Sequence, residues 1–414
     1  MSYFHNASKR KLELFIKGSK TLTNETYKHS TWDLLGFGVK ELAIVLVLGV
    51  IYLFMFITHS AFNLINASYA LMILGIILGI WCALRMSEIA VKSIESLAYS
   101  FLGVGAYVAG VLSSIASNTP ELALAGLSAY RGAVTNNPSL TEFAVLLVFA
   151  AALFNVLLVG IVIFVGARQA HSSHMKVPKA VIAVESDLMR ATVVMLGLVL
   201  ILGIAEYLLF LQPGKEFLPR EAAAILLLTY ILYIVYIFFG KPLKQAKAQE
   251  AEKEEAHDVH VHKLSKKATA ALLIIGFAGI AIGAELITHS VEIFIGFNPT
   301  IPIIIISVLI GASGSIPEHA IALISARKGQ LHLALGNTLS GVLQSYTLII
   351  GFIGVIALIP LDPAIIFQLA VGVAVVYLIK TSILDDEQLD VYEGIVIITV
   401  MAFSLILLIR TFSM

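Results

Sequence analysis

Charged residues are scarce in this chain. Only 13% of its 414 residues are Asp, Glu, Lys or Arg, whereas 59% are hydrophobic. Soluble globular domains are about 25% charged, so the composition excludes an ordinary soluble protein and favours one that crosses the lipid bilayer several times. Acidic and basic residues balance to a net charge of zero, which gives no indication of a nucleic-acid partner. We expect the bilayer as surroundings and no nucleic-acid partner.

Cysteine and the motifs of common enzymes are also missing. Cys82 is the only cysteine, which excludes a disulfide within the chain. There is no H-E-x-x-H metalloprotease motif and no glycine-rich phosphate-binding loop. The sequence therefore gives no support to an enzyme, and no cofactor is expected.

Long apolar segments dominate what is present. Segments of roughly 17–25 apolar residues are long enough to cross a bilayer as helices. The sequence predicts an all-α polytopic membrane protein with about eleven transmembrane helices. Their expected ranges are 41–58, 67–97, 101–130 (broken), 140–166, 187–211, 220–240, 267–296, 301–327 (broken), 331–357, 363–380 and 390–411.

The basic residues are distributed unevenly between the two sides of this layout. If the N-terminus lies inside, 23 of the 27 Lys and Arg residues fall on the inner side. Positive charge is enriched on the cytoplasmic side of membrane proteins. We therefore expect an integral protein of a prokaryotic cell membrane, with a cytoplasmic N-terminus and an outer C-terminus. The residues left outside are Arg131, Lys215, Arg220 and Arg410.

The most specific feature is a motif that occurs twice. Residues 117–132 read SNTPELALAGLSAYRG, and residues 314–329 read GSIPEHAIALISARKG. An offset of 197 aligns residues 85–132 with 282–329 without a gap, and 12 of the 48 positions are identical. The identities include three glutamates and one proline, and polar matches of this kind are improbable by chance in apolar segments.

The repeat predicts the organisation of the chain. One leading helix is followed by two halves of five helices each, and an odd number of helices means that the second half enters from the opposite side. Such an inverted repeat places its binding site near the bilayer midplane, between the halves. The expected parts are a cytoplasmic tail (1–40), the leading helix and its loop (41–66), the first half (67–240), an acidic, histidine-containing cytoplasmic linker (241–266) and the second half (267–414).

Each motif places a glutamate inside an apolar segment, where a carboxylate is costly and therefore points to function. The adjacent proline is expected to break the helix and free backbone carbonyls. Neutral oxygen ligands are expected from the helices that follow the motifs. The candidate cation-binding residues are Glu121, Glu318, Asn155, Asn337 and Gln344, and the candidate broken-helix backbone comprises Ser117, Asn118, Thr119, Pro120, Gly314, Ser315 and Pro317.

These candidates form an all-oxygen set with two carboxylates. Such a set suits a hard cation and favours Ca²⁺, which accepts roughly 6–8 oxygen ligands in flexible geometry. Glu121 and Glu318 are the candidate metal ligands. The same carboxylates can carry protons, because a buried carboxyl ionises less readily than a solvated one. Competition between the cation and protons predicts a secondary antiporter that works by alternating access.

At these residues the chain resembles the calcium/cation antiporter superfamily, and within it the cation/proton exchangers (CAX). The Glu318-His319 pair, Gln344, and Asn155 within F-N-V-L-L-V-G carry the resemblance. The motifs depart from the usual G-N-x-x-E pattern, and the G-S-N-x-x-N pattern of sodium/calcium exchangers is missing. The resemblance implies that Glu121 and Glu318 are principal Ca²⁺ ligands.

The resemblance also implies exchange of Ca²⁺ for H⁺, with Ca²⁺ as a substrate and not a cofactor. A sodium/calcium exchanger is the first alternative, and a cation channel is the more remote one. Na⁺ and Mn²⁺ are further candidate substrates. The sequence specifies no oligomeric state.

A second set of polar residues lies outside the two motifs. Glu88, Glu95 and their equivalents Glu285 and Glu292 are spaced two helical turns apart. With His319, they are candidates for vestibule groups that attract cations or relay protons. The alternative is that these glutamates only lie at the solvated ends of their helices.

Overall fold

The computed structural model describes residues 38–62, 65–97, 106–209, 217–239, 265–297, 302–361, 363–385 and 387–412. Almost all of the expected tail and linker lie outside these ranges. The chain divides into one unit at residues 1–43 and another at residues 44–414, and the description below concerns the second unit.

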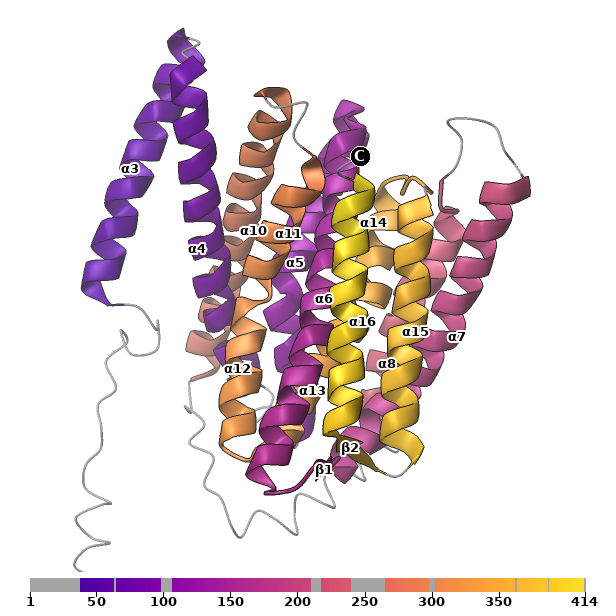
Figure 1. Cartoon of the computed structure of the whole chain (residues 1–414). Coiled ribbons are helices and arrows are strands. Elements are labelled where there is room, and N and C mark those ends of the chain that lie inside the picture. Colours follow the sequence, from indigo (N-terminus) through magenta and orange to yellow (C-terminus); the bar gives the residue numbers. More distant parts are fainter. Residues whose placement is uncertain are drawn as a thin grey trace, which may run out of the picture. The chain divides into compact units, whose positions relative to one another are not determined.

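The described residues are almost entirely helical (Figure 1). The helices in chain order are α3 (Val39–Phe62), α4 (Ile65–Leu97), α5 (Ala106–Thr135), α6 (Pro138–Gln169), α7 (Lys179–Leu209), α8 (Arg220–Phe239), α10 (Lys266–Phe297), α11 (Ile303–Gly314), α12 (Ile316–Arg327), α13 (Leu331–Gln344), the π-helical turn η2 (Ser345–Ile349), α14 (Ile350–Ile356), α15 (Pro363–Asp385) and α16 (Val391–Phe412).

Nine segments of the described chain are long and apolar enough to span a membrane. One of them is the continuous stretch α13–η2–α14, Leu331–Ile356. Helix α5 and the pair α11–α12, which carry the two motifs, are not among the nine. The break leaves α11 and α12 at 12 residues each, too short to span a membrane separately. Together these segments make the expected eleven. The predicted all-α polytopic fold is confirmed.

The first helices of the two halves, α4 and α10, pack directly against each other and run in opposite directions (Figure 1). Glycines allow the close approach. A Cβ atom added to Gly79 would lie 2.8 Å from the carbonyl oxygen of Gly283, and one added to Gly283 would lie 2.7 Å from that of Gly79. Small residues permit this spacing between membrane helices. The antiparallel course of equivalent helices is the arrangement expected of an inverted repeat.

Helix α6 lies in the core of the second unit. It begins at Pro138, whose fixed φ suits the first turn of a helix, and it is apolar around its whole circumference. Most of its side chains are buried, as expected for a helix without a polar face. It contacts α5, α11, α12, α13 and α16, so a polar side chain on α6 is held in fixed surroundings.

The only strands in the described residues are β1 (His174–Lys176) and β2 (Gln388–Asp390). They pair antiparallel, with Met175 opposite Leu389, and join the segment before α7 to the segment before α16. This ribbon marks one side of the helix bundle, called the ribbon side below, and α16 ends on the opposite side (Figure 1). An isolated bridge between Phe217 and Pro360 also joins the two halves.

The structure differs from the sequence prediction at the first motif. Helix α5 passes through Pro120 without interruption, so no break forms over residues 117–119. Proline cannot donate a hydrogen bond to the carbonyl four residues earlier, and here Ser87 of α4 donates to that carbonyl of Ala116 at 3.3 Å. A partner from another helix therefore satisfies the freed group, and the helix persists.

The second motif does break its helix. Helix α11 ends at Gly314, and α12 begins at Ile316, with Ser315 between them. Pro317 lies in the first turn of α12, where its missing N–H costs nothing. The two copies of the motif are therefore equivalent in sequence but not in backbone conformation.

Candidate functional site

The two motif glutamates are buried and belong to one site. Glu121 on α5 is 3% exposed and Glu318 on α12 is 1% exposed. The hydroxyl of Ser315 donates to Oε1 of Glu121 at 3.0 Å, and the hydroxyl of Ser117 donates to Oε1 of Glu318 at 2.9 Å. Each carboxylate is thus held by a serine from the other half, which brings the two motifs together.

The second oxygen of each carboxylate is left open. Oε2 of Glu121 and Oε2 of Glu318 are buried and have no hydrogen-bond partner in the described structure, and the same holds for Oδ1 of Asn118 and Oδ1 of Asn155. A buried polar atom without a partner is destabilising. Four such oxygens on α5, α6 and α12 are the chemical groups that a hard cation takes as ligands.

Gln344 organises one side of this site. Its Oε1 accepts a hydrogen bond from Nδ2 of Asn118 at 2.7 Å, while its Nε2 donates to the hydroxyls of Ser114 and Ser340 at 2.8 and 2.9 Å. Gln344 ends α13 directly before the π-helical turn η2, and such turns are frequent at functional sites. Its amide therefore orients Asn118, whose own oxygen stays open.

Asn155 and Asn337 have different surroundings. Asn155 is fully buried on α6. A Cβ added to Gly341 would lie 2.8 Å from Nδ2 of Asn155 and 2.9 Å from Oε2 of Glu318, so all three residues meet at one point. Asn337 instead donates from Nδ2 to the backbone carbonyl of Glu318 at 3.2 Å. Asn155 borders the open oxygens, whereas Asn337 fixes the first turn of α12.

A cavity reaches Glu121 from the side of the first helices. It lies among α4, α5, α6, α10 and α11, and apart from Glu121 its lining is largely apolar. Gly314 lies close to the carboxylate, because a Cβ built there would be 3.3 Å from Cγ of Glu121. The lining residues are Ile80, Ala83, Leu84, Pro120, Glu121, Leu124, Leu147, Ala284, Ile287, Ile310, Ser313 and Gly314.

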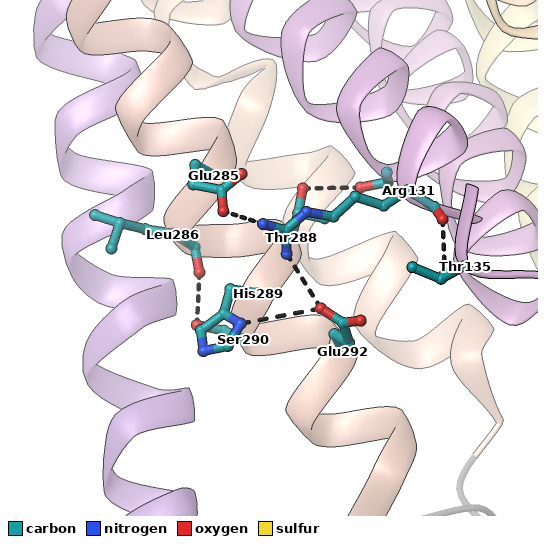
Figure 2. A network of polar contacts seen from close by, with 9 residues as sticks. Arg131, Thr135, Glu285, Leu286, Thr288, His289, Ser290 and Glu292 are labelled. Atoms are coloured by element: carbon teal, nitrogen blue, oxygen red, sulfur yellow. Dashed lines mark hydrogen bonds and ion pairs between the residues drawn. The ribbon is translucent and has the colours of Figure 1, made fainter. Parts of the chain in front are cut away.

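The vestibule glutamates of the second half are not part of this site. Figure 2 shows Arg131 of α5 between Glu285 and Glu292 of α10: it donates to Oε2 of Glu292 at 3.1 Å and forms an ion pair with Glu285. Nδ1 of His289 lies 3.9 Å from the same oxygen of Glu292. Sequence reasoning placed Arg131 outside and missed this contact. The sequence signal for this contact was a basic residue at the same position of both motifs, Arg131 in the first and Lys328 in the second.

The corresponding glutamates of the first half have another arrangement. Both carboxylate oxygens of Glu88 lie 3.0 Å from Nη1 of Arg85, one turn earlier on α4. The side chain of Glu95 lies outside the described part of the chain. His319 follows Glu318 on α12, and its half-buried ring lies against the backbone of Phe154.

Sequence reasoning also missed Glu185. The sequence placed this residue in a loop before a helix at 187–211, but α7 begins at Lys179 and buries the Glu185 side chain completely. Glu185 lies beside Tyr230 of α8, whose hydroxyl faces Gln344 and Ser340 of α13. The apolar run A-V-I-A-V before Glu185 was the signal that the helix starts earlier.

The chain matches one family of known proteins. The model of the family described as "Sodium/calcium exchanger protein" matches residues 67–239 and 268–410. The comparison with curated proteins found no match.

Solved exchanger structures share the architecture. A crystal structure of the H⁺/Ca²⁺ exchanger CAX is similar over 90% of this chain and 94% of that one, at 15% identity and a TM-score of 0.62. Two structures of the sodium-calcium exchanger NCX_Mj, soaked with Na⁺ and Sr²⁺, match 81% of this chain. They cover 98% and 99% of that protein at 17% and 18% identity, each with a TM-score of 0.53. At these identities the likeness shows a common fold. With the family match over both halves, it establishes that the chain belongs to the sodium/calcium exchanger protein family, whose members are membrane cation exchangers and not enzymes.

Proposed function

We propose that this protein is a secondary antiporter that exchanges Ca²⁺ for H⁺ by alternating access. Glu121 and Glu318 bind the cation in one half of the cycle and protons in the other. One observation carries the proposal: each buried carboxylate has one oxygen fixed by a serine of the other half and one oxygen without a partner.

The charge of the site favours a divalent cation. In the described structure, neither carboxylate is bonded to a Lys or Arg side chain, so two buried carboxylates share one site without a basic partner. Such charges are costly unless they are neutralised. One Ca²⁺ or two protons would neutralise the pair, and the open oxygens of Asn118 and Asn155 add neutral ligands of the type that Ca²⁺ accepts.

Obligatory exchange follows from the same cost. Ca²⁺ and protons compete for the same carboxylate oxygens, so the site cannot bind Ca²⁺ while both carboxylates are protonated. The empty, doubly charged site is the least stable form in the membrane interior. A change of access is therefore favoured only when the site holds either the cation or protons, which couples the two fluxes.

The comparisons support the substrate. The protein belongs to a family of sodium/calcium exchangers, and one similar structure is titled as an H⁺/Ca²⁺ exchanger. The Glu318-His319 pair and Gln344 favour the proton-coupled form through the sequence resemblance. The similarity to NCX_Mj makes sodium coupling the alternative that the experiment must separate, with Mn²⁺ as a further candidate substrate.

We also propose that the ribbon side faces the cytoplasm of a prokaryotic cell. Arg168, Lys176 and Lys179 lie around β1, and the linker at 241–266 contains six of the 27 Lys and Arg residues. By the positive-inside rule, both regions belong on the cytoplasmic side. The C-terminus then lies outside. Accessibility of single cysteines in right-side-out and inside-out vesicles tests this orientation.

The experiment is an exchange assay in proteoliposomes. With a pH gradient across the membrane and no sodium, added Ca²⁺ should discharge the gradient, and labelled Ca²⁺ should accumulate in proportion. Uptake that strictly requires sodium would show the sodium-coupled alternative. A flux far above the turnover of a carrier, with conductance in bilayers, would show a channel.

A further inference from the structure

The repeat pairs more than the two site glutamates. At the same offset of 197, Arg131 is equivalent to Lys328, because the motifs end in S-A-Y-R-G and S-A-R-K-G. Glu285 is equivalent to Glu88, and the third equivalent pair is Glu292 with Glu95. Each half therefore carries a basic residue at the equivalent position near the end of its motif helix, and two glutamates on its first helix.

In the first of these sets, contacts cross between the halves. Arg131 of α5 binds both Glu285 and Glu292 of α10 (Figure 2). One turn earlier on α5, the buried hydroxyl of Ser128 lies 3.0 Å from that of Thr288. These contacts make a continuous polar seam between α5 and α10, called the α5–α10 seam, on the side opposite the ribbon.

On the ribbon side, the equivalent residues Lys328 and Glu88 are not paired with each other. Lys328 follows the last residue of α12 and is exposed, and it makes no ion pair within the described part of the chain. Glu88 binds Arg85 of its own helix at 3.0 Å. Helices α11 and α12 also contact α4 less extensively than α5 contacts α10. The two halves thus differ at equivalent positions.

Because the repeat is inverted, the two sets of equivalent residues lie on opposite sides of the membrane, as the opposite directions of α4 and α10 show (Figure 1). If the two halves exchange conformations, the contacts of one set pass to the other, as in transporters built from inverted repeats. Ion pairs that are only partly buried are weak enough to open and close during turnover.

We propose that these sets are two alternating gates. Arg131 with Glu285 and Glu292 closes the side opposite the ribbon, and Lys328 with Glu88 closes the ribbon side in the other access state. The α5–α10 seam is closed in this structure, whereas Lys328 and Glu88 of its counterpart are not paired. The alternation rests on the proposed exchange function, but not on which ion drives it.

Disulfide cross-linking can report each gate. In a Cys82→Ser background, Ser128→Cys with Thr288→Cys reports the α5–α10 seam, because the two hydroxyls are already 3.0 Å apart. The equivalent positions, Ser325→Cys with Val91→Cys, report the counterpart on the ribbon side. An oxidant such as copper phenanthroline forms the bonds, and a reductant breaks them.

The expected result is mutual exclusion. Each pair alone cross-links, each cross-link stops exchange until it is reduced, and a molecule locked by the first pair does not form the second. Arg131→Gln should slow cross-linking of the first pair several-fold and speed the second. Lys328→Gln should do the reverse. Arg410→Gln, at an exposed arginine of α16, is the matched control and should change neither rate.

Two results would overturn the proposal. One is formation of both disulfides in the same molecule. The other is a Val91–Ser325 pair that never cross-links, or whose rate is unaffected by Lys328→Gln, a variant that leaves every ion pair of the described residues intact. Because the cross-linking rates need no transported ion, sodium-dependent uptake would refute the proton coupling and leave the gates standing.

Discussion

The hydroxyl of Ser117 donates a 2.9 Å hydrogen bond to Oε1 of Glu318, a residue 201 positions further along the chain. The bond crosses from the motif of one half to the motif of the other, and Ser315 returns a similar bond to Glu121. These two contacts are not related by the offset of 197, so the repeat alone does not produce them. They fix both carboxylates while leaving one oxygen of each open.

Removing either carboxylate charge should abolish Ca²⁺ transport. Glu121→Gln and Glu318→Gln each replace an anionic ligand with a neutral amide, and we expect a loss of more than about 100-fold, since even outer-shell changes cost 10–100-fold. The measurement is Ca²⁺ uptake into proteoliposomes. Glu221→Gln, at an exposed position on α8, should transport normally. Full activity of either site variant would exclude the two-carboxylate site.

Removing the serine hydroxyl should weaken Ca²⁺ binding without abolishing it. Ser117→Ala deletes a hydrogen bond to a charged group, which contributes about 1.5–3 kcal/mol, so we expect at least about a tenfold loss of apparent affinity. Ser307→Ala is the control, because among the described residues Ser307 donates only to the carbonyl of Ile303 in its own helix. Equal affinities of the two variants in calorimetry would contradict the role of Ser117.

A single methyl group should fill the site. In Gly341→Ala the added Cβ would lie within 2.8–2.9 Å of Asn155 and Glu318, closer than unbonded atoms approach. We expect Ca²⁺ binding to be lost while the protein still elutes as a folded species. Gly197→Ala on α7 is the matched control, because nothing lies within 4 Å of its added Cβ. Normal binding by Gly341→Ala would place the cation elsewhere.

Proton competition predicts the direction of the pH dependence. As pH falls, protons occupy the carboxylates and must leave before Ca²⁺ can bind, so apparent Ca²⁺ affinity should decrease. Displacement of two protons would give a change of up to about 100-fold per pH unit. Ca²⁺ titrations at several pH values, with sodium held at zero, measure it. An affinity that does not vary with pH would count against proton coupling.

The contact between the first helices should be sensitive to size. Gly283→Ala places a methyl group 2.7 Å from the backbone of α4, and overpacking of this kind costs about 1–3 kcal/mol. We expect a lower temperature of thermal unfolding in detergent. Gly296→Ala lies on the same helix in open space and should leave the temperature unchanged. Equal effects of the two substitutions would show that α4 and α10 do not pack closely.

Much of the fold follows from patterns that are local in the sequence. Apolar length predicts the spans, and the fixed offset predicts that Glu121 and Glu318 belong to one inverted pair. The course of α5 through Pro120 could not be predicted, because it depends on Ser87 from another helix. A proline shows which carbonyl it frees, but not which neighbour will satisfy that carbonyl.

The surroundings of the site were harder to predict than its centre. Gln344 was expected to be a ligand, yet its oxygen is occupied by Asn118. Amide orientation depends on every neighbour at once, and Ser114 and Ser340 decide it here. The helix predicted at 187–211 excludes Glu185, so the burial of this residue was not predicted. The carboxylate is instead buried where α7 packs against α8 and α13.

The β-ribbon has a mechanical consequence. Together with the Phe217–Pro360 bridge, the ribbon ties the later helices of one half to those of the other. These ties hold the segments around α7, α8, α15 and α16, and neither includes α4 or α10. Helices α4 and α10 can therefore move together relative to the other helices. Such a movement breaks none of the backbone hydrogen bonds that these two pairings form between the halves.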